Sequence, residues 1–373
     1  MPEASVCLRL VRVAESLMIG AAGGLVFTAA KFPAGWLAGA MTFAAAAALA
    51  GRKVYVPAAV ARGASIIMGI TIGGAVTPDT LRSIAAWPLS IAMVALSVAA
   101  VTLATFTYLT RMHRWSPVTA IYASIPGGLA QVMVLAAEEG RRCDIRGVAI
   151  VQTVRVVILT VVVPVALSLS GRSGGARPPA GAVSAAEAPA AFAGLAGAAT
   201  AAALALTRMG FPGGMLFGPL AVSAALHGSS AVTVAMPSWL ATAAMVGLGT
   251  LAGSRFTGLG FRLLLWYFRA ALGAFAVSLA VAAAIGVAVT IVVPLPMGDI
   301  IVAYAPGAVD TMMILALALN LDPVFVGTHH VVRVFVVLLG MPFAIRYLAG
   351  PATKTKKRTG GTRAPPPGGE AVL

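Results

Sequence analysis

Charged residues are scarce in this chain: Asp, Glu, Lys and Arg together make up 10% of its 373 residues. A soluble domain carries about 25% charged residues, so a chain with so few cannot coat a water-soluble globule of this size. The scarcity excludes a soluble enzyme, a disordered chain and a peripheral membrane protein. Hydrophobic residues make up 60%, and the mean hydropathy is +0.96. These values predict an all-α polytopic membrane protein.

The residue types that build catalytic and metal centres are also few. The chain has two cysteines, four histidines and 11 acidic residues. Two cysteines cannot form a disulfide framework or a multi-cysteine metal site. The sequence contains no phosphate-binding loop, nucleophile elbow or zinc motif. We therefore expect no enzyme activity, no catalytic residues, no bound metal and no cofactor.

Long polar stretches are missing as well. The two longest cover residues 171–189 and 350–373, which is too little for a sizeable extramembrane or DNA-binding domain. The formal net charge is +15, but Lys and Arg lie mostly in short loops and the tail, as in membrane proteins with basic cytoplasmic loops. The expected partners are the lipid bilayer and a small-molecule or ion substrate, without direct nucleic-acid binding.

What the sequence does contain is a series of apolar runs long enough to cross a bilayer. In the first half the predicted spans are 13–30, 34–50, 58–76, 84–110 and 147–169, with a broken stretch at 117–137. In the second half they are 190–206, 213–226, 237–251, 263–294 and 325–348, with a broken stretch at 297–319. The predicted domains are a first repeat at 13–170, a linker at 171–189, a second repeat at 190–349 and a basic disordered tail at 350–373.

Three pairs of segments indicate that the two halves are homologous. Residues 32–39 (FPAGWLAG) match 211–218 (FPGGMLFG), 125–128 (IPGG) match 305–308 (APGA), and 151–155 (VQTVR) match 329–333 (HHVVR). The offsets are 179, 180 and 178 residues. Three matches in order at nearly one offset predict a duplicated membrane unit.

The positions of the positive charges predict the orientation of the two units. If each half has five crossings plus one re-entrant or broken helix, most loop arginines and both termini lie in the cytoplasm, and the two repeats are inverted. The alternative has six crossings per half, twelve in all, with parallel repeats. It places more arginines outside and fits less well, so ten spans are preferred over twelve.

Both broken stretches contain a Pro-Gly corner. Proline removes a backbone donor, and main chain freed in this way must be buried in protein or line a wet cavity. Paired breaks in two halves are typical of a transport site near mid-membrane, whereas the alternative is a simple kink or a surface loop. The candidate residues at the corners and around them are Pro126, Gly127, Gly128, Pro306, Gly307, Ser124, Gln131, Tyr304, Asp310 and Thr311.

Four ionisable side chains lie within or next to apolar runs and are candidates for substrate or ion binding. Asp310 could couple transport to a proton or cation, or could merely cap a helix at the interface. Arg155 and Arg333 occupy equivalent positions and need a carboxylate, a cage of carbonyls or an anionic substrate, unless they snorkel. Asp310 is the expected partner of one of them. His330 shares a helical face with Arg333 and is either part of a proton relay or a satisfied polar residue.

The motifs quoted above resemble those of the AbrB family of bacterial integral membrane proteins. The resemblance rests on the two Phe-Pro-x-Gly-Trp/Met-Leu-x-Gly segments, the two Pro-Gly corners and the D-P-x-F-V-x3-H-x2-R stretch at 322–333. It implies two AbrB duplication units over nearly the whole chain. Members carry labels such as ammonia monooxygenase or transcriptional regulator. The few histidines argue against a copper monooxygenase, and regulation of gene expression would have to be indirect.

These observations together favour a secondary transporter or exporter of a small solute, anionic in the simplest case, in the bacterial inner membrane. The alternative is a membrane-embedded sensor or regulator that binds a ligand without moving it. Small-residue faces at 20–24 and 194–197 suit close helix packing or a homodimer.

Overall fold

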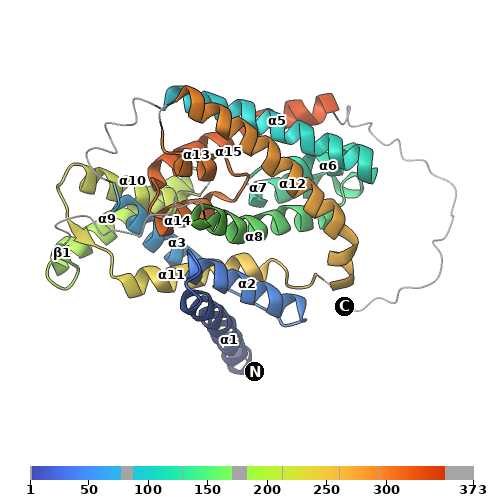
Figure 1. The fold of residues 1–373 in the computed structure, drawn as a ribbon. Coiled ribbons are helices and arrows are strands. Elements are labelled where there is room, and N and C mark those ends of the chain that lie inside the picture. Colours follow the sequence, from blue (N-terminus) through green and yellow to red (C-terminus); the bar gives the residue numbers. More distant parts are fainter. Residues whose placement is uncertain are drawn as a thin grey trace.

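The computed structural model describes residues 2–76, 87–127, 129–169, 183–211, 213–259, 261–293 and 295–348. The expected basic tail, Gly128 and most of the expected linker lie outside the described residues. The described chain is almost entirely helical, and its two strands have two residues each (Figure 1).

Helices of matching length follow one another in the two halves. The first half contains α1 (Pro2–Ala29), α2 (Gly35–Leu49), α3 (Ala58–Gly73), α5 (Pro88–His113), α6 (Pro117–Ser124), α7 (Leu129–Glu138), the 3₁₀ turn η2 (Gly140–Arg142) and α8 (Ile145–Leu169). The second half contains β1 (Val183–Ser184), α9 (Pro189–Arg208), α10 (Gly214–Gly228), β2 (Val234–Ala235), α11 (Ser238–Ser254), α12 (Phe261–Val292), α13 (Met297–Tyr304), α14 (Val309–Ala318) and α15 (Pro323–Leu348).

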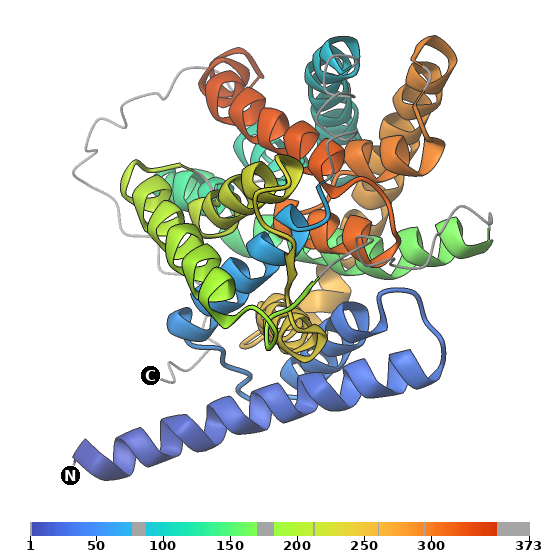
Figure 2. The same ribbon diagram turned by 90° about the vertical axis from the view of Figure 1, so that its left-hand side faces the viewer.

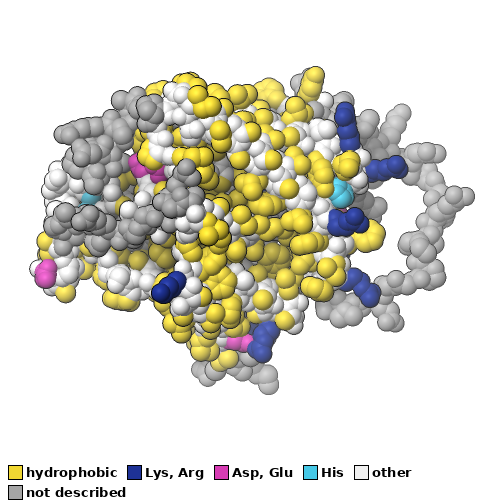
Figure 3. All heavy atoms as spheres, viewed as in Figure 1, with side chains coloured by type: hydrophobic (Ala, Val, Ile, Leu, Met, Phe, Trp, Pro, Cys, Tyr) yellow, Lys and Arg dark blue, Asp and Glu magenta, His cyan; other side chains and the backbone are white. Residues whose placement is uncertain are grey.

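Six of the described helices are long and apolar enough to cross a membrane: α1, α5, α8, α9, α12 and α15. Their outer faces carry large apolar side chains, as on α5, where Leu89, Leu96 and Leu103 recur every seven residues and are about half exposed. Hydrophobic side chains dominate the face seen in Figure 3, and Lys and Arg gather toward its right-hand edge. An apolar exterior of this extent belongs in lipid, so the protein is an all-α membrane protein.

The helices form two packed groups. In the first, neighbours follow the order α1, α2, α11, α3, α10 and α9. In the second, α5 packs against α12. Helices α6 and α15 contact α5, α8 and α13 contact α12, and α7 and α14 pack against these surrounding helices. Both views place α5, α12 and α15 on the side of the molecule opposite α1 (Figures 1 and 2). The packing pairs recur between the halves. The contact of α2 with α11 corresponds to that of α10 with α3, and the contact of α1 with α2 corresponds to that of α9 with α10.

Two glycine pairs allow the close contacts between helices of different halves. Gly69 and Gly73 of α3 face the main chain of α10, and Gly249 and Gly253 of α11 face the main chain of α2. A Cβ added at Gly253 would lie 2.5 Å from the carbonyl oxygen of Met41. Glycines four residues apart therefore let backbones approach where no larger residue fits.

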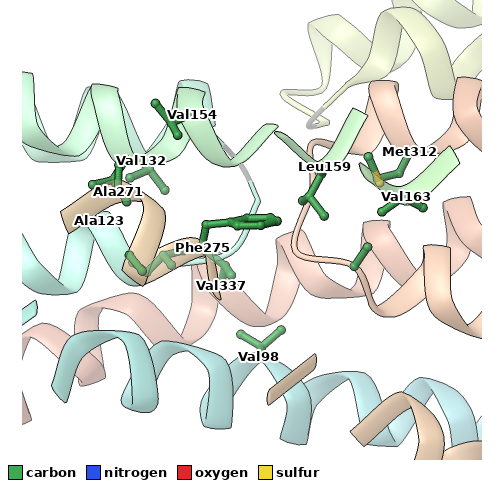
Figure 4. Packing of buried hydrophobic residues seen from close by; sticks show 14 of the residues in the cluster. Val98, Ala123, Val132, Val154, Leu159, Val163, Ala271, Phe275, Met312 and Val337 are labelled. Atoms are coloured by element: carbon green, nitrogen blue, oxygen red, sulfur yellow. The ribbon is translucent and has the colours of Figure 1, made fainter. Parts of the chain in front are cut away.

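The main apolar core lies in the second group of helices. Phe275 of α12 lies at its centre, between Val337 of α15 and Leu159 of α8 (Figure 4). Met312 of α14 packs close to Leu159 at one end of the same cluster. This core surrounds the two broken stretches and fixes their position inside the protein.

Candidate functional site

Each broken stretch consists of two short helices joined by a Pro-Gly corner. Both corners are buried; the chain leaves α6 through Pro126 and Gly127, and α13 through Pro306 and Gly307. α6 begins at Pro117, whose ring suits a first helical position, with Ser116 accepting a hydrogen bond from the Thr119 N–H. Proline after the last turn then ends each short helix.

The two corners lie against each other. Gly127 has a φ of +86°, which favours glycine. A Cβ at this position would lie 3.7 Å from the Gly307 carbonyl oxygen and 3.5 Å from Cδ of Arg333. The structure therefore brings together two breaks that are about half the chain apart in sequence.

Arg333 of α15 binds the C-terminal end of α13. Its side chain is 2% exposed. Nη1 donates to the carbonyl oxygen of Ala305 at 2.6 Å, and Nη2 donates to that of Ala303 at 2.7 Å. These carbonyls have no partner within the helix because α13 ends there, so the guanidinium satisfies them.

His330 belongs to the same network. Its Nδ1 lies 3.2 Å from Nη1 of Arg333, and its Nε2 lies 3.2 Å from the carbonyl oxygen of Val302. Because a guanidinium can only donate, Nδ1 accepts and Nε2 donates to the carbonyl. His330 is thereby held as the neutral tautomer with its proton on Nε2.

Arg155 of α8 binds the end of α6 in the same way. Its Nη2 donates to the carbonyl oxygen of Ile125 at 2.9 Å and to Oε1 of Gln152. Gln152 Nε2 donates to the carbonyl oxygens of Tyr122 and Ile125 at 3.0 and 2.9 Å. Gln152 thus takes the place of His330 in the first half. Sequence reasoning used Gln152 only as part of the internal match and missed it as a site residue.

The site carries positive charge without a nearby counter-ion. Arg155 and Arg333 are close enough for their like charges to repel each other. Among the described residues, neither forms an ion pair with a carboxylate, and Nε of Arg155 is buried without a hydrogen-bond partner. The helix ends they bind supply only partial negative charge. The arrangement can therefore accept an anion or an additional hydrogen-bond acceptor.

Asp310 lies one turn after the Pro306 corner but interacts with a different charge from the one expected. It is in the first turn of α14, and the charge it interacts with is Arg255 at the end of α11. The ion pair expected between Asp310 and one of the two arginines is not found among the described residues, where both Nη atoms of Arg333 bind main-chain carbonyls and Nη1 also contacts His330. Arg255 was expected in a cytoplasmic loop, and no sequence signal connects it with Asp310.

The remaining polar candidates lie near the corners with partners of their own. Ser124 Oγ donates to the Ala120 carbonyl of its own helix, and Tyr304 Oη donates to the main-chain oxygen of Ser90. Thr311 is 8% exposed in the first turn of α14. The side chain of Gln131 and all of Gly128 lie outside the described residues.

Aspartates at the starts of α8 and α15 fix the residue at which each helix begins, and with it the position of Arg155 and Arg333 along the helix. Asp144 Oδ1 accepts from the N–H groups of Arg146 and Gly147, and Asp322 Oδ1 accepts from those of Val324 and Phe325. Such caps begin a helix at a defined residue.

Cys143 lies in the loop before Asp144. Burial raises the pKa of its thiol to about 11, so it is not a ready nucleophile. Within the described part of the chain, no three His, Cys, Asp or Glu residues are grouped to hold a metal ion.

The comparisons with known proteins now identify the family. The family profile described as "Transition state regulatory protein AbrB" matches residues 36–349. The chain belongs to the AbrB family. A curated Escherichia coli (strain K12) protein named as a candidate regulator AbrB is 26% identical over 338 residues, which is 88% of this chain and 94% of that protein. No solved structure matches the chain. The AbrB match spans both broken stretches and both arginines.

Proposed function

We propose that this AbrB-family protein is a secondary transporter or exporter of a small anionic solute in the bacterial inner membrane. One observation carries the proposal: two buried guanidinium groups, without a carboxylate partner among the described residues, lie where two interrupted helices meet. Charged side chains inside a membrane protein generally mark a substrate pathway. An anion bound there would relieve the repulsion between Arg155 and Arg333.

The architecture supports the same proposal. The helix order, the packing pairs and the arginine contacts of one half recur in the other. An odd number of crossings per half makes such repeats inverted, which is typical of secondary transporters with a site at mid-membrane. We further propose that both termini are cytoplasmic, since this orientation places most loop arginines inside.

Asp310 is the proposed coupling residue. It is a carboxylate at the positive end of α14, one turn from the Pro306 corner, with Arg255 near enough for their charges to interact. A proton or cation bound at Asp310 would change the charge beside the anion site, so the two binding events would be linked.

The test is a flux experiment in proteoliposomes. Vesicles with and without the protein are loaded with a size-filtered extract of bacterial metabolites, and efflux is measured by mass spectrometry. We expect some anionic metabolites to leave at least tenfold faster when the protein is present, and Asp310→Asn to abolish this difference. Glu187→Gln, which changes an exposed carboxylate in the turn before α9, is the matched control and should have no effect. Undiminished flux in Asp310→Asn would remove Asp310 from the mechanism.

The names of the family and of the Escherichia coli relative favour a second candidate function, a membrane-embedded sensor acting indirectly on gene expression. The same site would then bind its ligand without moving it. Ligand binding with no counterflow in the vesicles would support the sensor and contradict the transporter.

A further inference from the structure

Four cationic side chains line a single hollow whose walls share no residue with the Pro-Gly corners. The hollow has a volume of about 660 Å³ and is lined by Arg9 and Arg12 of α1, by Arg52 and Lys53 of the α2–α3 loop, and by the α11–α12 loop. We refer to it as the basic hollow. Within the described chain, the carboxylate that pairs with these residues is Glu15, which binds Arg52. The hollow therefore has a surplus of positive charge.

Hydrogen bonds join the three walls of the basic hollow. The N–H of Tyr55 donates to Ser16 Oγ on α1 at 2.9 Å, and Thr257 Oγ1 donates to the carbonyl oxygen of Val54 at 3.1 Å. These bonds join the α2–α3 loop to α1 and to the α11–α12 loop. The shape thus exists before any ligand binds, which lowers the entropic cost of binding.

The rest of the lining is largely apolar, and α1 also carries exposed apolar side chains beyond its two arginines. Leu49 and Leu259 contribute to the walls. Val11, next to Arg12, begins a stripe on α1 that continues through Met18 and Leu25, each more than half exposed. A ligand with a negatively charged head and long apolar chains fits this combination, whereas a fully hydrophilic anion gains nothing from the apolar stripe.

We propose that the basic hollow binds the headgroup of an anionic phospholipid, with the acyl chains lying along α1. Basic sites between membrane helices on the cytoplasmic side bind such headgroups, and each Lys or Arg near them contributes about 1 kcal/mol. The lipid joins α1 and α2 of the first half to the α11–α12 loop of the second. It therefore stabilises the contact between the halves. This assignment is independent of transport.

Binding is tested by native mass spectrometry of the full chain in detergent, titrated with phosphatidylglycerol, cardiolipin or neutral phosphatidylethanolamine. We expect the two anionic lipids to bind and to raise the melting temperature, cardiolipin most because it carries two phosphates. Equal binding of phosphatidylethanolamine would overturn the proposal without any variant. Competition by sodium pyrophosphate at millimolar concentration would also overturn it, since the ligand would then be a soluble phosphate compound.

Variants locate the site. The triple change Arg9→Gln, Arg12→Gln and Lys53→Gln removes three of the cations and should weaken phosphatidylglycerol binding about 100-fold, which corresponds to ~3 kcal/mol, or about 1 kcal/mol for each cation removed. The matched control is Arg111→Gln with Arg262→Gln, which changes exposed arginines of α5 and α12 and should alter binding less than twofold. An equal loss in the control would show a general charge effect instead of a site. Size-exclusion profiles identify variants that fail to fold.

Discussion

At the scale of single residues, Arg155 and Arg333 bind main-chain carbonyls at the ends of α6 and α13, where the helical hydrogen bonds stop. A buried acceptor without a donor costs about 1–3 kcal/mol. These arginines are therefore part of the fold as well as candidates for substrate binding, and their two roles need separate measurements.

Replacing Arg333 with methionine keeps an unbranched side chain but removes all donors. The carbonyl oxygen of Ala303 would then lose its donor, whereas that of Ala305 would keep the Gly307 N–H, so we expect Arg333→Met to lower the free energy of unfolding by about 1–3 kcal/mol. Unfolding in mixed micelles measures this, with Arg262→Met as a control that should stay within about 0.5 kcal/mol. Unchanged stability of Arg333→Met would contradict the capping role.

The sequence was sufficient to predict that Arg155 and Arg333 lie within helices and are equivalent. It was not sufficient to predict their partners, because a main-chain carbonyl carries no residue-specific signal. The expected partner Asp310 is an acid of the right charge, but it begins α14 and faces Arg255. That proximity depends on how α11 packs on the rest of the molecule, which the sequence pattern does not contain.

At the scale of helices, the Pro-Gly corners were predicted well, and the starts of the spans were predicted within about four residues except for the first, which was expected at residue 13 and begins at Pro2. The stretch expected at 297–319 is α13 and α14, and the span expected at 325–348 is α15 (Pro323–Leu348). Periodicity and proline positions carry this information. The pairing of α3 with α10 and of α2 with α11 was not predicted, because small residues favour close packing without specifying a partner.

The small-residue face at 20–24 is an example of packing whose partner the sequence does not specify. It was expected to serve close packing or a dimer, and the described contacts of Gly20, Gly23 and Gly24 are with α2 and α11 of the same chain. Gly194 and Gly197 of α9 have open space around them, so the homodimer stays a prediction.

Gly253 gives a sharp test of helix packing. Any side chain at this position would overlap the main chain of α2 at Met41, so Gly253→Leu should cost at least about 3 kcal/mol, beyond ordinary overpacking. Gly197→Leu places the same side chain in open space on α9 and should be nearly neutral. The two variants are compared by their melting temperatures in detergent. Equal melting temperatures would contradict the close contact of α11 with α2.

At the scale of the whole molecule, the orientation is a prediction from charge. We expect a fluorescent protein fused to the C-terminus to be bright and alkaline phosphatase fused there to be inactive, since phosphatase needs the periplasm. The same fusions placed in the linker at 171–189 should give the opposite result if the repeats are inverted with five crossings each. Matching results at both positions would instead support six crossings per half.

The interleaved packing has a consequence for synthesis. The glycine face of α3 and the face of α2 that contacts Gly249 and Gly253 enter the bilayer before α10 and α11 have been translated. At roughly 5–20 residues per second, the nascent chain spends many seconds with these faces open to any helix leaving the translocon. Assembly of this protein is therefore delayed, because the first half cannot complete its interior until the ribosome has made most of the second.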